Sequence, residues 1–98
     1  MLFIAEFGRH ADKPDAFRQA LQPHLDYLEA HKDKVLLSAT KHAAEDGKVR
    51  GFVWIIEAQD ADEARRICEQ DPFWTAGLRT SFQLSSLTKA LPDHVAKV

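Results

Sequence analysis

Short apolar segments separated by polar residues and turn signals recur along the chain. In the first segment Phe3, Ala5 and Phe7 occupy every second position, which predicts a strand with one buried face. Asp46-Gly47 lies between the second and third segments and predicts the turn of a hairpin. The predicted strands are residues 2–8, 34–39, 51–58 and 80–87.

Two longer amphipathic segments predict helices. The first has a candidate N-cap at Asp12 and ends near His31. The second opens with Asp60 and Glu63, which form the Asp-x-x-Glu pattern of a capping box, and it ends near Gln70. Both helices therefore have a start signal in the sequence that can be compared with the structure.

The order β-α-β-β-α-β predicts an α+β fold of the ferredoxin-like type, with two helices on one face of a four-stranded antiparallel sheet. We expect one domain over residues 1–98. The other face of the sheet, with Phe or Trp at alternate positions of the first and third strands, is then left as an apolar surface. A second subunit stacked sheet to sheet is the simplest cover, so we predict a homodimer.

Composition narrows the classes of function. The chain has 98 residues and a formal net charge of −2 with acids and bases interspersed, so it lacks the concentrated basic face that nucleic-acid binding requires. One cysteine, Cys68, rules out an intrachain disulfide, and no apolar segment approaches the roughly 20 residues that span a bilayer. We therefore expect a cytoplasmic protein that binds neither nucleic acid nor a membrane.

One histidine occupies a position where an apolar residue is expected. At about 100° per residue, His24 falls in the same stripe as Phe17, Leu21 and Leu28, on the side of the first helix that should face the sheet. The preceding Pro23 removes a backbone hydrogen bond and is expected to bend the helix and open space. His24 is therefore either a core histidine bonded to a backbone carbonyl or a residue of a cleft.

Asp71 has two interpretations as well. It directly precedes Pro72, so its carboxylate can cap a short helical turn. A carboxylate can also hold one ring nitrogen of a histidine, which fixes the tautomer and raises the basicity of the other nitrogen. The two roles are compatible within one side chain.

Two segments taken together resemble the YciI-like proteins, the YCII-related domain family. They are HLDYLE at residues 24–29 and DPFWTAGL at residues 71–78, and SLTKALP at residues 86–92 adds to the likeness. The resemblance runs from the first strand to the tail. It implies a dimeric α+β barrel, in which two four-stranded sheets face each other, and a cleft with a His–Asp pair. Carried over residue by residue, that pair is His24 and Asp71.

The resemblance also implies a class of function. One branch of the family removes chloride from a chlorinated hydroxyhydroquinone, and muconolactone isomerases share the wider superfamily. We therefore expect a lyase- or isomerase-like enzyme, in which His24, oriented by Asp71, takes a proton from a small aromatic or enolisable acid. Trp74, His31 and Arg18 are candidate substrate-binding residues. Arg18 is included because Leu21 stands where many relatives have an arginine.

Two other functions stay open from the sequence. A non-catalytic ligand-binding or regulatory dimer would use the same cleft without a reaction. A haem or metal protein is the third candidate, since the chain has five histidines. Against it, neither HExxH nor a cysteine pair is present, and His24 and His31 are loosely spaced. We predict no cofactor and no metal.

Overall fold

The computed structural model describes residues 1–96, so the last two residues of the domain predicted over residues 1–98 lie outside the described range. The strands form one antiparallel sheet in the order β2-β3-β1-β4. The strands are β1 (Leu2–Phe7), β2 (Val35–His42), β3 (Val49–Glu57) and β4 (Phe82–Leu87), and the helices are α1 (Pro14–Ala30), α2 (Ala61–Glu69) and α3 (Pro72–Thr75).

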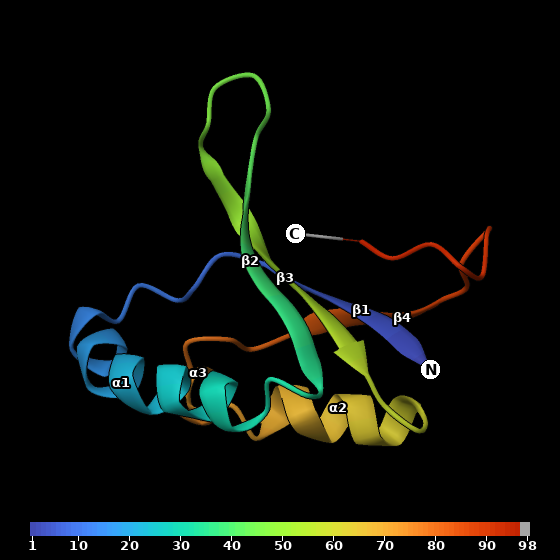
Figure 1. Ribbon diagram of the computed structural model, residues 1–98. Helices are drawn as coiled ribbons and strands as arrows, with labels where there is room; N and C mark the ends of the chain where they lie inside the picture. The colour runs from blue at the N-terminus through green and yellow to red at the C-terminus, as the bar shows by residue number, and fades with distance from the viewer. Residues whose placement is uncertain (97–98) are drawn as a thin grey trace.

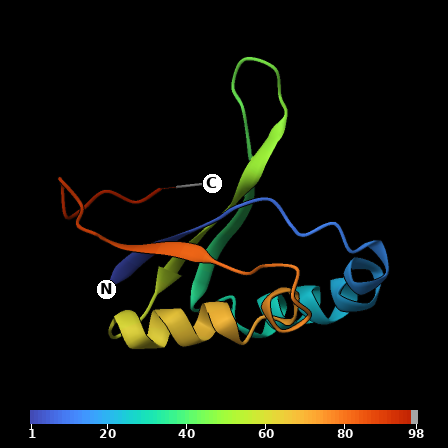
Figure 2. The same ribbon diagram turned by 180° about the vertical axis from the view of Figure 1, so that it is seen from behind.

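All three helices lie on the same side of the sheet, and the turn of the β2–β3 hairpin extends away from them (Figure 1). The opposite view shows the same layering, with β4 at one edge of the sheet and α3 between the two longer helices (Figure 2). The predicted ferredoxin-like α+β fold is therefore confirmed. The hairpin predicted around Asp46-Gly47 is also present, and Gly47 has the positive φ of 73° that its turn requires.

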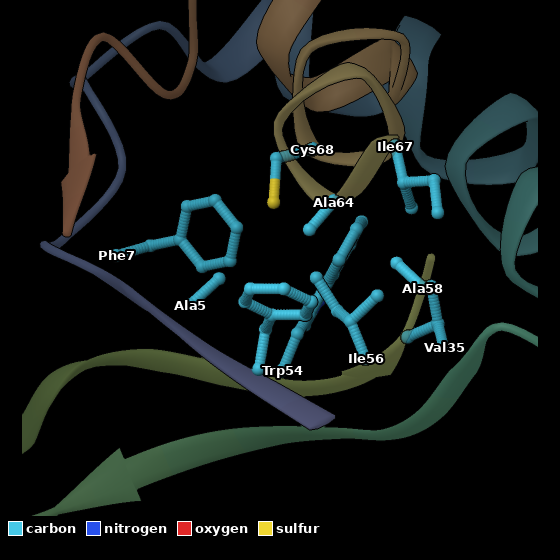
Figure 3. Packing of buried hydrophobic residues seen from close by; sticks show 10 residues of the cluster. Ala5, Phe7, Val35, Trp54, Ile56, Ala58, Ala64, Ile67 and Cys68 are labelled. Carbon is cyan, nitrogen blue, oxygen red and sulfur yellow. The ribbon is translucent and has the colours of Figure 1, made fainter. Parts of the chain in front are cut away.

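The apolar core lies between the central strands and α2 (Figure 3). Strand register pairs Ala5 with Trp54, so both side chains point to the same face, where Trp54 is fully buried. Cys68 on α2 packs into the same cluster and is also fully buried. Phe7 meets the Trp54 ring edge to face, at 5.3 Å between ring centroids. Trp54 thus joins the strands to the helix layer.

The aromatic residues of β1 and β3 lie on the helix-covered face, and the prediction that they line the open face is wrong. Phe3 pairs with Ile56, and both are buried in the cluster beneath α2. The open face instead carries the alternate aliphatic residues. These are Leu2, Ile4, Leu37, Val53 and Ile55, all half-buried in this chain.

The helix starts follow the sequence signals in one case only. The backbone N–H of Glu63 donates to the Asp60 carboxylate at 2.8 Å, so the predicted N-cap of α2 is confirmed. Helix α1 begins at Pro14 with Lys13 as its N-cap and no side-chain cap bond, so the predicted cap at Asp12 is wrong. Pro23 lies inside α1, which continues through it from Pro14 to Ala30.

Gly51 allows β3 to pass close to the end of β1. A Cβ atom at this position would lie 2.1 Å from the carbonyl oxygen of Phe7, and the φ of Gly51 is +152°. Only glycine fits such an approach without a shift of the backbone. The contact holds β3 against the segment that leads from β1 to His10, which becomes part of the candidate site.

No helix among residues 1–96 is both long enough and apolar enough to cross a membrane.

Candidate functional site

A cavity of about 280 Å³ opens between α1, β2, β3 and α3. The segment between β1 and α1 and the segment between α3 and β4 also contribute to its wall. Its walls are mainly aromatic and aliphatic, with a few polar side chains among them, the composition typical of small-molecule sites. The lining residues are His10, Phe17, Leu21, His24, Leu25, Ser38, Ala39, Thr40, Phe52, Phe73 and Arg79.

His24 and Asp71 form a buried pair at this cavity. Their relative exposures are 6% and 0%, and His24 Nδ1 lies 2.7 Å from Asp71 Oδ1. The partner of His24 is thus a carboxylate and not the backbone carbonyl that a core histidine would use. An ionised carboxylate can only accept a hydrogen bond, so in the neutral imidazole Nδ1 carries the proton and Nε2 keeps its lone pair. That arrangement suits a general base.

The backbone brings Asp71 to His24 by an abrupt change of direction after α2. Asp71 has an extended conformation, φ −62° and ψ 134°, as expected for a residue before proline. Its backbone carbonyl accepts hydrogen bonds from the N–H groups of Trp74 and Thr75, but its carboxylate makes no cap bond. The predicted double role is therefore wrong, because both carboxylate oxygens are used by other side chains.

The second carboxylate oxygen of Asp71 accepts a hydrogen bond from Arg79, a residue that was not predicted from the sequence. Arg79 Nη1 donates to Asp71 Oδ2 at 3.0 Å, and Arg79 is 4% exposed. Its guanidinium lies 4.3 Å from the centroid of the Phe7 ring, a cation–π contact. Burial lowers the pKa of Arg79 from its usual value, and the Asp71 charge opposes that shift. Asp71 thus lies between His24 and Arg79, and the opposite charges of Asp71 and Arg79 balance each other.

Phe73 forms the surface against which both imidazoles of the cavity rest. The ring of His24 stacks on it at 3.8 Å between centroids, with 7° between the planes. His10, in the segment between β1 and α1, forms a T-shaped pair with Phe73, at 4.9 Å between centroids and 72° between the planes. Phe73 is 3% exposed and directly follows Pro72 in α3, so the short helix fixes its position. The Phe73 ring therefore sets the orientation of the His24 imidazole.

His10 is the second functional candidate that sequence reasoning missed. Its ring stacks on Phe52 at 4.2 Å with 15° between the planes. The pKa of His10 is lowered to about 4, first by burial and then by the charges of Arg79 and His24, against the opposing charge of Asp71. His10 is therefore a neutral imidazole at neutral pH. Its Nε2 atom is buried and has no hydrogen-bond partner among the described residues.

The three predicted substrate-binding residues are not among the residues that line the cavity. Trp74 packs edge to face against Phe82, at 5.4 Å between centroids. His31 ends α1, where its Nδ1 lies 2.8 Å from the Tyr27 carbonyl oxygen. Arg18 is exposed and pairs with Asp15 on the outer side of α1. A binding role for Trp74, His31 and Arg18 stays a prediction without support from the cavity.

Within residues 1–96, His, Cys, Asp and Glu side chains nowhere gather in a group of three or more that could hold a metal ion.

Comparison with known proteins places these residues in a family. The model of the YCII-related domain matches residues 1–88, which include every strand and helix of the structure. The chain belongs to the YCII-related domain family. Both members of the His24–Asp71 pair, as well as His10 and Arg79, lie inside the matched range. No curated protein sequence matches this YCII-related chain.

One solved structure is similar over most of its length. It is the 5-chloro-2-hydroxyhydroquinone dehydrochlorinase of Burkholderia phenoliruptrix in complex with 2,5-dihydroxybenzoquinone. The TM-score is 0.72 and the identity 27%, over 90% of this chain and 94% of that chain. A protein of Agrobacterium tumefaciens matches with a TM-score of 0.40 and 13% identity, over 92% of this chain and 94% of that chain.

Proposed function

We propose that this chain is a small-molecule enzyme of lyase or isomerase type that moves a proton on a small hydroxylated aromatic or enolisable substrate. The observation that carries the proposal is the buried contact of 2.7 Å between His24 Nδ1 and Asp71 Oδ1 at the wall of the cavity. Asp71 holds the proton on Nδ1, so that Nε2 can accept one from a substrate. Arg79 balances the Asp71 charge from the side opposite to His24.

A dehydrochlorination is the reaction that fits best. Two hydroxyl hydrogens leave the oxygens of a chlorinated hydroquinone; one returns to the ring carbon that bore chlorine, and the other departs as the proton of HCl. The C–Cl bonding pair leaves with chloride, and the ring becomes a quinone. The carbon that loses chlorine is reduced as the ring is oxidised, so no external oxidant is needed. His24 Nε2 carries the proton between these atoms during the reaction.

Two observations support an aromatic substrate. Its walls include Phe17, Phe52 and Phe73, which favour a planar ring, and its polar groups are few. The similar structure, at 27% identity, is named as a dehydrochlorinase of a hydroxylated, chlorinated ring and holds a dihydroxylated quinone. Both observations favour the same class of substrate, one from this chain and one from a relative.

We also propose that the enzyme works as a homodimer in the cytoplasm. The half-buried aliphatic residues of the open sheet face are the surface for the second subunit, and an obligate interface there would bury on the order of 2,000 Å² or more in total. Ile55 lies opposite both Ile4 and Leu37 in the sheet, so Ile55→Glu should yield monomers in light scattering. A dimer that withstands this charge would contradict the assignment of the interface.

The experiment for the catalytic proposal is chloride release from 5-chloro-2-hydroxyhydroquinone under anaerobic conditions. His24→Asn should reduce the rate by about 10²- to 10⁴-fold, because the Asn amide can still donate to Asp71 but provides no base. His94→Asn is the matched control, since His94 is exposed in the tail, and it should keep the full rate. Undiminished chloride release by the His24→Asn variant would sink the proposal.

A second candidate is the non-catalytic ligand-binding or regulatory dimer. It is favoured by the same cavity, because the aromatic walls and paired polar groups bind a ring whether or not it reacts. Binding without any chloride release by the wild-type protein would select this alternative.

A further inference from the structure

The imidazole of His10 packs against aromatic rings but forms no hydrogen bond within the described chain. Its ring is held by Phe52 and Phe73, and it makes no hydrogen bond to any described residue. A phenylalanine could occupy such an aromatic setting without loss. A buried nitrogen without a partner instead costs about 1–3 kcal/mol. A group kept at that cost is expected to have a partner that arrives from outside.

The position of His10 indicates where that partner binds. His10 and His24 both line the cavity and both contact the same Phe73 ring, His10 in a T-shaped arrangement and His24 by stacking. Because stacking alone holds His10, a half-turn about its Cβ–Cγ bond can bring a nitrogen to either edge of the ring and preserve the contact with Phe52. A ligand that lies against His24 is therefore within the same enclosure as His10.

We propose that His10 is a specificity-determining residue, whose imidazole hydrogen-bonds one hydroxyl group of a planar ring while His24 acts at another. This inference rests on the proposed function, because it uses the same cavity. It names the ligand class more narrowly, as an uncharged ring with at least two hydroxyl groups.

The charges of the cavity exclude the main competitor, a carboxylate ligand. Among the described residues that line the cavity, Arg79 is the one Lys or Arg, and its charge is already matched by Asp71 at 3.0 Å. His10 is neutral at neutral pH, since burial and the charges of Arg79 and His24 disfavour its protonation. A neutral imidazole pairs well with a hydroxyl group but offers a carboxylate no counter-ion.

The test removes the hydroxyl groups and the imidazole in turn. Dissociation constants are measured by anaerobic calorimetry for benzene-1,2,4-triol, for the three diols that each lack one of its hydroxyls, and for benzoate. With the wild-type protein, loss of the hydroxyl bound by His10 should weaken binding by roughly threefold to tenfold, as expected for one neutral hydrogen bond. Benzoate should bind worse than every diol.

His10→Phe preserves the stacking on Phe52 and should make that one hydroxyl irrelevant, so that the triol and the corresponding diol bind equally. His10→Gln, which restores a polar group, should recover part of the difference. His94→Phe is the matched control and should behave as the wild type. Circular dichroism of each variant establishes that it is folded.

The outcomes separate this inference from the proposed function. If His10→Phe retains the contribution of every hydroxyl, the inference fails even where His24 is required for chloride release. If the hydroxyl effect depends on His10 but no chloride is released, the inference stands and the catalytic proposal fails. Equal binding of benzoate and triol, or a loss of dimer in His10→Phe without any change in the hydroxyl effect, would overturn the inference.

Discussion

The helix-covered side of the sheet is filled in two different ways. Beneath α2, Trp54, Ile56 and Cys68 form an apolar cluster with no charged member. At the other end, beneath α1 and α3, aromatic rings surround the buried charges of Asp71 and Arg79. The first region is stabilised by burial of apolar surface, to which each residue contributes separately. The second depends on mutual compensation, because each charged group is tolerable only beside its partner.

The largest effect is expected where that compensation is removed. Arg79→Met retains the length and apolar contacts of the side chain but leaves Asp71 without its counter-charge, which should cost about 3–5 kcal/mol of unfolding free energy in urea denaturation. In the double variant with Asp71→Asn, part of that loss should return. Equal costs in the single and double variants would mean that the two charges are not coupled.

His24 should show a smaller version of the same dependence. His24→Leu leaves Asp71 Oδ1 without its partner and should cost about 1–3 kcal/mol in unfolding free energy. His24→Asn restores a donor near the Nδ1 position and should cost clearly less. Thermal and urea unfolding of both variants provide the comparison, and an equal loss would show that the hydrogen bond to Asp71 is not what stabilises His24.

The apolar region should tolerate a comparable change more easily. Ile56→Val removes one methylene group from the fully buried cluster and should cost about 0.5–1.5 kcal/mol in the same unfolding experiment. A cost as large as that of Arg79→Met would erase the contrast between the two regions.

The smallest effect is expected on the stability that the folded protein loses in acid. The ordinary pKa of His10, 6.5, is lowered to about 4 in the folded chain, first by burial and then by the charges of Arg79 and His24, against Asp71. Between these values the unfolded chain binds the extra proton, so stability falls as the pH drops from 6.5 to about 4. His10→Phe should remove about 1 kcal/mol of this loss, a figure discounted for the partial exposure of His10. Urea unfolding at pH 7 and pH 4.5 measures it, and an identical acid loss in both proteins would refute the assignment.

The same contrast explains what the sequence could predict. The strands and the α2 cap follow from period and local signals, since apolar alternation and an Asp-x-x-Glu pattern act within a few residues. His24 stood out because a polar side chain interrupted an apolar stripe, and Asp71 because it preceded Pro72 in a family-like segment. Their contact of 2.7 Å joins residues 47 positions apart, and only the resemblance indicated it.

Arg79 and His10 had no comparable signal. Each is a single polar residue in an irregular segment beside a strand, where a charged or exposed side chain is the ordinary expectation. Their burial results from tertiary packing of Phe7, Phe52 and Phe73 around them. The wrong face assigned to the aromatic strand residues has the same origin, because alternation fixes which residues share a face but not which face the helices cover.

The fully buried Cys68 can be used to measure how often the apolar core opens. Burial raises the pKa of this thiol to about 12, and it is the one cysteine in the sequence. Alkylation by iodoacetamide therefore requires both exposure of α2 and formation of the thiolate. Mass spectrometry of the labelled fraction over time yields the frequency with which the core opens, with no need for a substrate or a known reaction.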